Sequence, residues 1–362
     1  MGAKLVTIDD VSQEAGVSSA TVSRVISNNG YVSAEARQRV ERAIAALGYV
    51  PNAMARGLKT RRSGSVALLV PEIINSFYTT LARGAEDVAN DNGLHLILGN
   101  TDEKPEKERV YAQLMIASRV EGVLVASAGR SAKPLKLLAE RELPTVLVDR
   151  VVDGFKADIV RGDSFNGAIA LTEHLLALGH SQIALINGHP ETSVAADREA
   201  GYREAMRRAG IKVDDRRISR GAWFVDDAEQ RVAELLENGV PITAIFGANN
   251  FMAIGALRAL RSRGLRVPED VALVSFDDIE VAAEIDPFLT VMSQPAYSMG
   301  TLAMGFLIER ILGKYQGPPR ELVVTPRLIQ RRSCGASLKS TNVPLESGNS
   351  ESTENSSKLR EA

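Results

Sequence analysis

The chain has 362 residues, which is too long for one ordinary domain and suits a small module joined to a larger body. Its net charge of −2 shows that the whole molecule is not a basic nucleic-acid binder. The charge is uneven, however: residues 1–62 contain nine basic and five acidic side chains, a net charge of +4, so residues 63–362 carry −6. This distribution fits contact with nucleic acid through one end, and it also fits a merely soluble basic terminus.

Cysteine content and hydropathy exclude several classes of protein. Cys334 is the single cysteine, so no intrachain disulfide can form. No apolar run approaches the roughly 20 residues that cross a bilayer, and the first ten residues lack the apolar centre of a signal peptide. We therefore expect a cytoplasmic protein without a membrane partner.

The N-terminal residues predict three short helices. Thr7 and Asp10 have the spacing of a capping box at the start of the first helix, which Gly16 ends. Ser18 and Ser33 are predicted N-caps of the second and third helices. Because a tight glycine turn joins the first two, these helices form a predicted helix-turn-helix unit.

The second predicted helix carries small or polar side chains and one arginine on its outer face: Ser18, Ser19, Ala20, Thr21, Ser23 and Arg24. Short side chains let a helix lie deep in the major groove of DNA, and an arginine can donate two hydrogen bonds to guanine. The helix alone fits an ordinary solvated face equally well.

Four segments together resemble the lactose-repressor/galactose-repressor (LacI/GalR) family of transcription regulators: Thr7-Ile8-…-Val11, Ala15-Gly16-Val17-Ser18, Thr21-Val22-Ser23-Arg24-Val25 and Gly48-Tyr49-Val50-Pro51-Asn52. The resemblance implies that Ser19, Ala20 and Arg24 read bases. It also implies that a second set of residues lies near phosphates or groove walls, where contacts position the protein without reading sequence: Thr7, Ser18, Thr21, Ser23, Tyr31, Ser33 and Tyr49.

The segment Asn52–Leu58 resembles the hinge helix of the family. It is too short to be stable alone, because isolated helices need about 12–15 residues. The resemblance implies that two hinges pair in the minor groove, where Leu58 wedges a base step apart and Asn52 and Ala55 add contacts. The alternative is a plain linker with one exposed leucine.

Beyond the hinge, seven apolar runs alternate with helical segments: Val66–Val70, His95–Leu98, Val123–Ala126, Val146–Val148, Ile183–Ile186, Ala244–Phe246 and Val271–Phe276. Such runs predict buried parallel strands, here in two doubly wound α/β sheets. The family resemblance implies two Rossmann-like lobes of the periplasmic-binding-protein type, with a ligand between them. It also implies three crossings between the lobes, which we expect near Arg161–Ser164, Val291–Gln294 and Thr325–Leu328.

These features predict a helix-turn-helix domain over residues 1–50, a hinge over 51–62 and an effector-binding core over 63–335. Within the core, we expect an N-subdomain (about 63–162 and 293–326) and a C-subdomain (about 163–292 and 327–335). The tail, residues 336–362, is rich in polar residues and is expected to be disordered. It has no sustained leucine heptad, so we predict a homodimer rather than a tetramer.

Ligands of such sheets bind beyond the carboxyl ends of the strands, where the chain places several polar and aromatic residues: Asn75, Phe77, Tyr78, Asp149, Arg150, Arg198, Trp223, Asn249, Phe276, Asp277 and Gln294. Carboxylates, guanidinium groups and amides can bind the hydroxyls of a sugar, and aromatic rings can cover its C–H face. Two acids against two arginines predict a nearly neutral site and an uncharged ligand, although Asp149 and Arg150 also fit a structural ion pair.

The set resembles the site of ribose-binding proteins, which makes a pentose the first expectation. Asn250 stands where the family usually has Asp, and Ser275 where it usually has Gly. These departures leave the ligand open, and the small pair Ser19-Ala20 leaves the operator open.

The sequence contains no Walker-type loop, no glycine fingerprint after a strand and no histidine spacing typical of a metal site. We therefore expect neither an enzyme nor a cofactor or metal. The predicted function is a transcriptional repressor that binds a near-palindromic double-stranded DNA operator under the control of a small ligand. A corepressor-type regulator that binds a purine or another small metabolite is the first alternative, and a sugar-binding transport component is the second.

Overall fold

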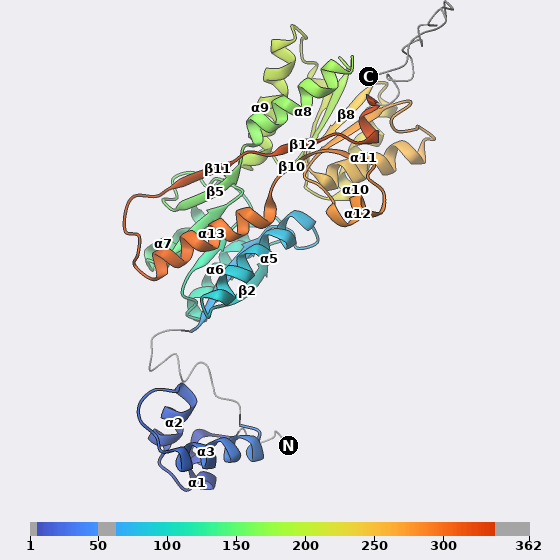
Figure 1. Cartoon of the computed structure of the whole chain (residues 1–362). Helices are drawn as coiled ribbons and strands as arrows, with labels where there is room; N and C mark the ends of the chain where they lie inside the picture. The colour runs from blue at the N-terminus through green and yellow to red at the C-terminus, as the bar shows by residue number, and fades with distance from the viewer. Residues whose placement is uncertain (1–5, 50–62, 337–362) are drawn as a thin grey trace, which may run out of the picture.

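The computed structural model describes residues 6–49 and 63–336 of the chain (Figure 1). These residues form a three-helix unit and an α/β core. The hinge residues Asn52, Ala55 and Leu58 and the tail residues 337–362 lie outside the described residues.

The three-helix unit consists of α1 (Ile8–Ala15), α2 (Ser19–Ser27) and α3 (Ala34–Leu47). The predicted capping box is confirmed, because the Thr7 hydroxyl accepts from the Asp10 amide while the Asp10 carboxylate accepts from the Thr7 amide. Gly16 ends α1 with a φ of 60°, a left-handed conformation that favours glycine. Ser18 and Ser33 cap α2 and α3 with their hydroxyls. The apolar faces of all three helices meet in one small hydrophobic cluster.

The core contains two six-stranded sheets. The first has the order β11-β5-β4-β3-β1-β2 and the second β12-β10-β9-β8-β6-β7. Adjacent strands are parallel throughout, except that β10 and β12 are antiparallel. The strands of the first sheet are β1 (Ser65–Val70), β2 (His95–Asn100), β3 (Val123–Val125), β4 (Thr145–Val148), β5 (Asp158–Gly162) and β11 (Glu321–Val324). Those of the second are β6 (Ile183–Asn187), β7 (Ile218–Arg220), β8 (Ala244–Gly247), β9 (Ala272–Phe276), β10 (Thr290–Ser293) and β12 (Arg327–Ile329).

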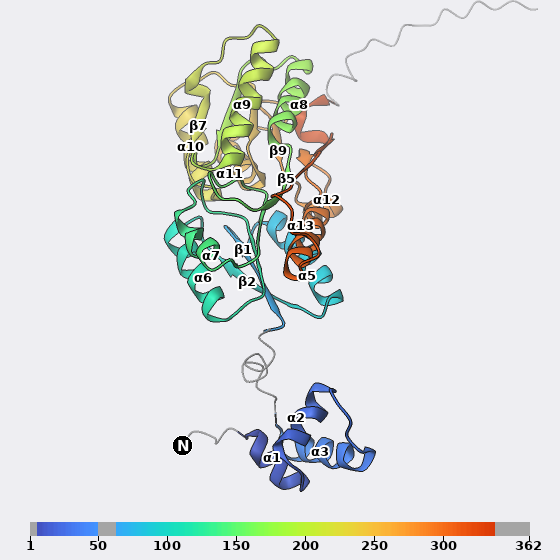
Figure 2. The same cartoon turned by 90° about the vertical axis from the view of Figure 1, so that its left-hand side faces the viewer.

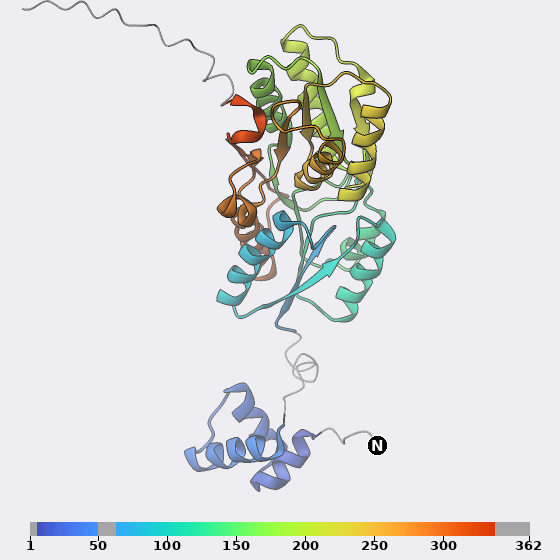
Figure 3. The ribbon, with the colours of Figure 1, turned by 90° about the vertical axis from the view of Figure 1, so that its right-hand side faces the viewer.

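Helices cover both faces of each sheet. The helices of the first lobe are α5 (Ser76–Asp91), α6 (Pro105–Ala117), α7 (Lys136–Glu140) and α13 (Ala296–Ile311), and those of the second are α8 (Ser164–Ala177), α9 (Ser193–Arg208), α10 (Val225–Glu237), α11 (Asn250–Ser262) and α12 (Glu280–Ile285). Figure 2 shows α6 and α7 on one side of the first sheet and α5 and α13 on the other, and Figure 3 shows this layering from the opposite side. Within residues 6–49 and 63–336, no helix combines the length and apolarity needed to span a membrane.

All seven predicted apolar runs form strands, which confirms the α/β architecture with two sheets. Five further strands complete the sheets, namely β5, β7, β10, β11 and β12. The chain leaves the first sheet between β5 and α8, returns between β10 and α13, and leaves again between β11 and β12. Three connections therefore join the lobes, and residues from both lobes reach the cleft between them.

Candidate functional site

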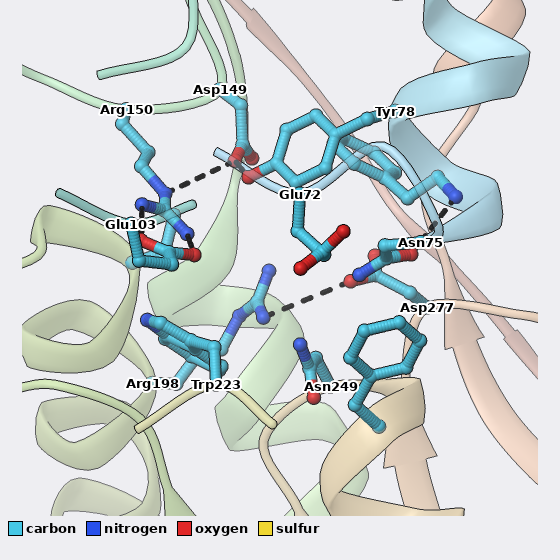
Figure 4. A pocket seen from close by; sticks show the side chains of 13 residues that line it. Glu72, Asn75, Tyr78, Glu103, Asp149, Arg150, Arg198, Trp223, Asn249 and Asp277 are labelled. Carbon is cyan, nitrogen blue, oxygen red and sulfur yellow. Dashed lines mark hydrogen bonds and ion pairs between the residues drawn. The ribbon is translucent and has the colours of Figure 1, made fainter. Parts of the chain in front are cut away.

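A pocket lies between the two lobes, with about 350 Å³ of empty space that is partly open to solvent. We call it the effector pocket (Figure 4). Its lining residues are Glu72, Asn75, Phe77, Tyr78, Glu103, Asp149, Arg150, Val194, Arg198, Trp223, Asn249, Phe251 and Asp277. Nine of the eleven residues predicted from strand ends are among them. The other two contact lining residues: the Phe276 ring packs against Arg198, and the Gln294 amide donates to Asp277.

Two aspartates face the effector pocket from corresponding places in the two lobes. Asp149 follows β4 and Asp277 follows β9, each directly after the last strand residue. Both adopt a left-handed backbone conformation, with φ of 66° and 63°. Such conformations are unfavourable for most residues other than glycine and concentrate at functional sites.

In the first lobe, the polar groups of the effector pocket largely satisfy one another. The Tyr78 hydroxyl donates to the Asp149 carboxylate at 2.9 Å. The guanidinium of Arg150 donates two hydrogen bonds to Glu103, at 2.7 and 2.8 Å, and one to the Ser127 carbonyl. Asp149 is 3.8 Å from the Arg150 guanidinium, so the main ion pair of Arg150 is with Glu103, and the structural pair predicted for Asp149 is secondary.

In the second lobe, Arg198 makes fewer hydrogen bonds than Arg150 makes in the first. Arg198 donates to the Ala248 carbonyl, stacks on the Phe276 ring with its guanidinium carbon 3.9 Å from the ring centre, and lies 3.9 Å from Asp277. Its Nε atom, like Nε of Arg150 and Nε1 of Trp223, has no hydrogen-bond partner among the described residues. Buried donors of this kind are normally satisfied.

Burial raises the pKa of Asp277 to about 6, although Arg198 and the amide of Gln294, which donates to the Asp277 carboxylate at 2.7 Å, act in the opposite direction. Burial also raises the pKa of Asp149 and moves that of Tyr78 well above its usual value. Asp277 therefore changes its charge near pH 6, while the Tyr78 hydroxyl keeps its proton and remains a donor.

The structure corrects the predicted charge balance of the effector pocket. Glu72 and Glu103 join Asp149 and Asp277, so four carboxylates face the guanidinium groups of Arg150 and Arg198. Figure 4 shows the Glu72 carboxylate pointing into the pocket. The formal charge of the lining is thus negative rather than neutral.

Several hydrogen bonds join the lobes directly around the effector pocket. The Asn250 amide donates to the side-chain oxygen of Asn75 at 2.9 Å, and the Val151 amide donates to the Ser193 hydroxyl at 2.9 Å. Asn75 is the N-cap of α5 and Asn250 is the first residue of α11. Asn250, the departure from the family noted in the sequence, therefore bridges the two lobes.

The predicted DNA-binding residues that the structure describes lie on α2, in the segment between α2 and α3, and at the ends of α1 and α3. The Ser18 and Thr21 hydroxyls lie 3.0 Å apart, and the Ser19 hydroxyl donates to the Asp9 carboxylate at 2.7 Å. Ala20, Arg24 and Tyr31 are exposed, Ser23 is partly buried, and Tyr49 packs against the hydrophobic cluster of the unit. Thr7 and Ser33 use their hydroxyls as helix caps.

Comparison with known proteins assigns the chain to a family. The model described as "Bacterial regulatory proteins, lacI family" matches residues 7–52, and the model of a periplasmic binding protein-like domain matches residues 172–334. The ribose operon repressor of Halalkalibacterium halodurans is 36% identical over 331 residues, which cover 91% of this chain and 98% of that protein. The chain belongs to the lacI family of bacterial regulatory proteins.

Other lacI-family proteins match along nearly the same length. The repressor PurR of Escherichia coli O139:H28 is 36% identical over 331 residues, 91% of this chain and 97% of that protein. The solved structure of the lac repressor dimer bound to operator and the anti-inducer ONPF has a TM-score of 0.77 and 28% identity, covering 91% of this chain and 99% of that one. This lacI-family chain is a DNA-binding transcriptional repressor with a ligand-binding core, and it is not an enzyme.

Four residues of the effector pocket escaped the predictions: Glu72, Glu103, Val194 and Phe251. Glu103 follows the end of β2 at the sheet edge that also supplies Asp149, so the strand-end rule would have found it had it been applied to that strand. Glu72 lies in the loop between β1 and Asn75. The sequence holds no comparable signal for Val194 or Phe251.

Proposed function

We propose that the effector of this repressor is an uncharged, pentose-like sugar that binds in the effector pocket and releases the operator. The observation that carries the proposal is that Asp149 and Asp277 line the pocket from opposite lobes. Arg198, which makes one side-chain hydrogen bond, to the Ala248 carbonyl, lines it beside them. Carboxylates accept from adjacent hydroxyls, and a guanidinium donates in a fixed fork. The rings of Phe77 and Trp223 line the same pocket and can cover the C–H face of a sugar.

The charge of the lining supports an uncharged ligand. Four carboxylates face two arginines, and Arg150 is already paired with Glu103. A ligand that carries a phosphate or a carboxylate would place its negative charge beside the carboxylates of the lining in a buried space, which is strongly unfavourable. A polyol instead supplies hydroxyl donors to the same oxygens.

The repressor is proposed to act as a homodimer on a near-palindromic operator. The lac repressor, which matches 91% of this chain, is a dimer bound to operator, and two-fold proteins read two-fold sites. Within each subunit, Ser19, Ala20 and Arg24 are proposed to read bases, and Leu58 with Asn52 and Ala55 to enter the minor groove. The effector core is proposed to span residues 63–335.

A purine corepressor is the second candidate for the effector. The PurR repressor of Escherichia coli O139:H28 is as similar to the chain as the ribose operon repressor is, at 36% identity. The rings of Phe77, Trp223 and Phe251 at the effector pocket suit a flat heterocycle. Such a ligand would tighten operator binding, whereas the proposed sugar weakens it.

The test is a thermal-shift screen of pentoses, hexoses and nucleobases, followed by operator titrations with and without the best ligand. Arg198→Ala and Asp277→Asn each leave buried partners unmatched, so we expect a loss of several kcal/mol in sugar binding. Both variants should bind operator as tightly as the wild-type protein, since the helix-turn-helix unit is unchanged, and should no longer release it. Release of operator from either variant at the wild-type sugar concentration would contradict the site.

A further inference from the structure

The base-reading face of α2 contains an acidic partner that the sequence did not indicate. The Ser19 hydroxyl donates to a carboxylate oxygen of Asp9, with the two oxygens 2.7 Å apart. Asp9 lies in the first turn of α1 and Ser19 is the first residue of α2, so the hydrogen bond spans the turn of the helix-turn-helix unit.

This hydrogen bond fixes the chemical character of Ser19. A serine hydroxyl has one proton to donate and two lone pairs that accept, whereas an ionised carboxylate only accepts. Ser19 also lies 3.5 Å from the Ser12 hydroxyl, but that hydroxyl donates to the Asp9 carbonyl at 3.0 Å. With its proton directed to Asp9, Ser19 can offer only lone pairs to a base.

Ser19 is the first residue of α2, the helix that the family resemblance makes the recognition helix. The N-terminal residues of such a helix contact base edges in the major groove, and Asp9 is exposed beside them. We infer that Asp9 and Ser19 together form an acceptor surface that selects an exocyclic amino group, either N4 of cytosine or N6 of adenine. Asp9 is thus a specificity-determining residue of the repressor, and the inference rests on DNA binding, not on the identity of the effector.

The physical reason is the pattern of donors and acceptors along the groove. Cytosine presents an amino group where thymine presents a carbonyl oxygen, and adenine presents an amino group where guanine presents one. An acceptor surface attracts the amino group and repels the carbonyl oxygen. Asp9 therefore acts largely by rejecting the wrong base. A negative charge close to the DNA backbone lowers affinity in general, but it can still raise specificity in this way.

The helix-turn-helix unit has little net charge of its own. Residues 6–49 contain four basic and five acidic side chains, a net charge of −1, so the excess positive charge of residues 1–62 lies on the flanking segments. The Asp9 carboxylate also interacts favourably with the positive end of the α1 helix dipole. That effect stabilises the fold and would change the affinity for every DNA sequence equally.

The experiment measures how single C-to-T and A-to-G changes in the operator alter the affinity of the repressor. Sites are selected from randomised duplexes with the full-length wild-type protein. Each C is then changed to T, and each A to G, one base pair per half-site, and binding is titrated. At one position in each half-site we expect a loss of about tenfold or more for the wild-type protein. The base selected there, cytosine or adenine, identifies which amino group is read.

Asp9→Asn and Ser19→Ala should both reduce that loss to about threefold or less, because an asparagine can turn its amide to donate and an alanine presents no acceptor. The double variant should resemble either single variant, since the two residues act as one unit. The swaps at all other positions should keep their wild-type effect.

Glu14→Gln is the matched control, because it removes one negative charge from the same helix at an exposed position. It should keep the wild-type preference at every position. The inference is overturned if Asp9→Asn retains the wild-type response to every swap. It is also overturned if Asp9→Asn weakens binding to all duplexes by the same factor, which would show a structural role.

Discussion

At the scale of single residues, the effector pocket depends on carboxylates in unusual surroundings. Asp277 is almost fully buried, accepts from the Gln294 amide, and has a pKa raised to about 6 by burial. A ligand hydroxyl that donates to this carboxylate stabilises the ionised form and lowers its pKa. Ligand binding and the ionisation of Asp277 are therefore linked.

This linkage predicts how effector affinity depends on pH. Above about pH 6, Asp277 is ionised and affinity should be constant. Below it, affinity should fall by up to about tenfold for each pH unit, because the proton must leave before the hydroxyl can bind. Isothermal titration of the sugar found in the screen between pH 5 and pH 8 measures this. An affinity that stays constant down to pH 5 would exclude a hydroxyl contact with Asp277.

Two controls separate this effect from unfolding and from other groups. Because the pKa of Asp277 is raised in the folded state, Asp277 makes the ligand-free fold more stable below its unfolded-state pKa, and this contribution is lost as the pH rises through about 6. Loss of affinity at low pH is therefore not expected from loss of the fold, which a melting curve can verify. Asp277→Asn, which cannot ionise, should bind weakly with no step near pH 6.

At the scale of elements, both lobes rely on helices that approach one another at glycines. A Cβ at Gly300 of α13 would lie 2.0 Å from the Leu81 carbonyl oxygen of α5, and one at Gly84 of α5 would lie 2.2 Å from a carbonyl oxygen of α13. Gly201 of α9 and Gly255 of α11 make equally close approaches in the second lobe. These contacts set the distance between the helices on each sheet and thereby the positions of the residues at their N-termini.

The helix contact in the first lobe can be tested with two alanine substitutions in α13. Gly300→Ala introduces a methyl group against backbone and should lower the free energy of unfolding by about 1–3 kcal/mol. Gly305→Ala, at a position with no atom within 4 Å of the added Cβ, should raise it by up to about 1 kcal/mol through helix propensity. Urea unfolding monitored by circular dichroism measures both. Equal stability of the two variants would show that α5 and α13 separate at little cost.

At the scale of the whole molecule, the effector pocket exists only where the lobes meet. Asn75 with Asn250, and Val151 with Ser193, connect the lobes by hydrogen bonds around it. A ligand can shift the lobe arrangement only by binding one arrangement more tightly than another. Residues that touch both the ligand and the opposite lobe are therefore the ones through which DNA affinity can respond.

The proposed assembly gives a prediction at the same scale. Without a leucine heptad in the tail, the protein should sediment as a homodimer both as the full chain and after removal of residues 336–362. Analytical ultracentrifugation over a range of protein concentrations measures this. A tetramer that disappears when the tail is removed would contradict the interpretation of the tail.

The sequence by itself determined the helix caps, the seven principal strands and the α/β class, because each depends on residues within one helical turn or one strand. Thr7 with Asp10, and Gly16, are examples in which spacing alone identified the local structure. The strand-end rule also placed Asp149 and Asp277 at the cleft, since the ends of parallel strands share one edge. Tertiary structure alone decided that Val194 and Phe251 join the pocket, that Gln294 supports Asp277, and that Asp9 accepts from Ser19. Those contacts depend on loop paths and on the packing of segments distant in sequence, and local patterns carry no record of either.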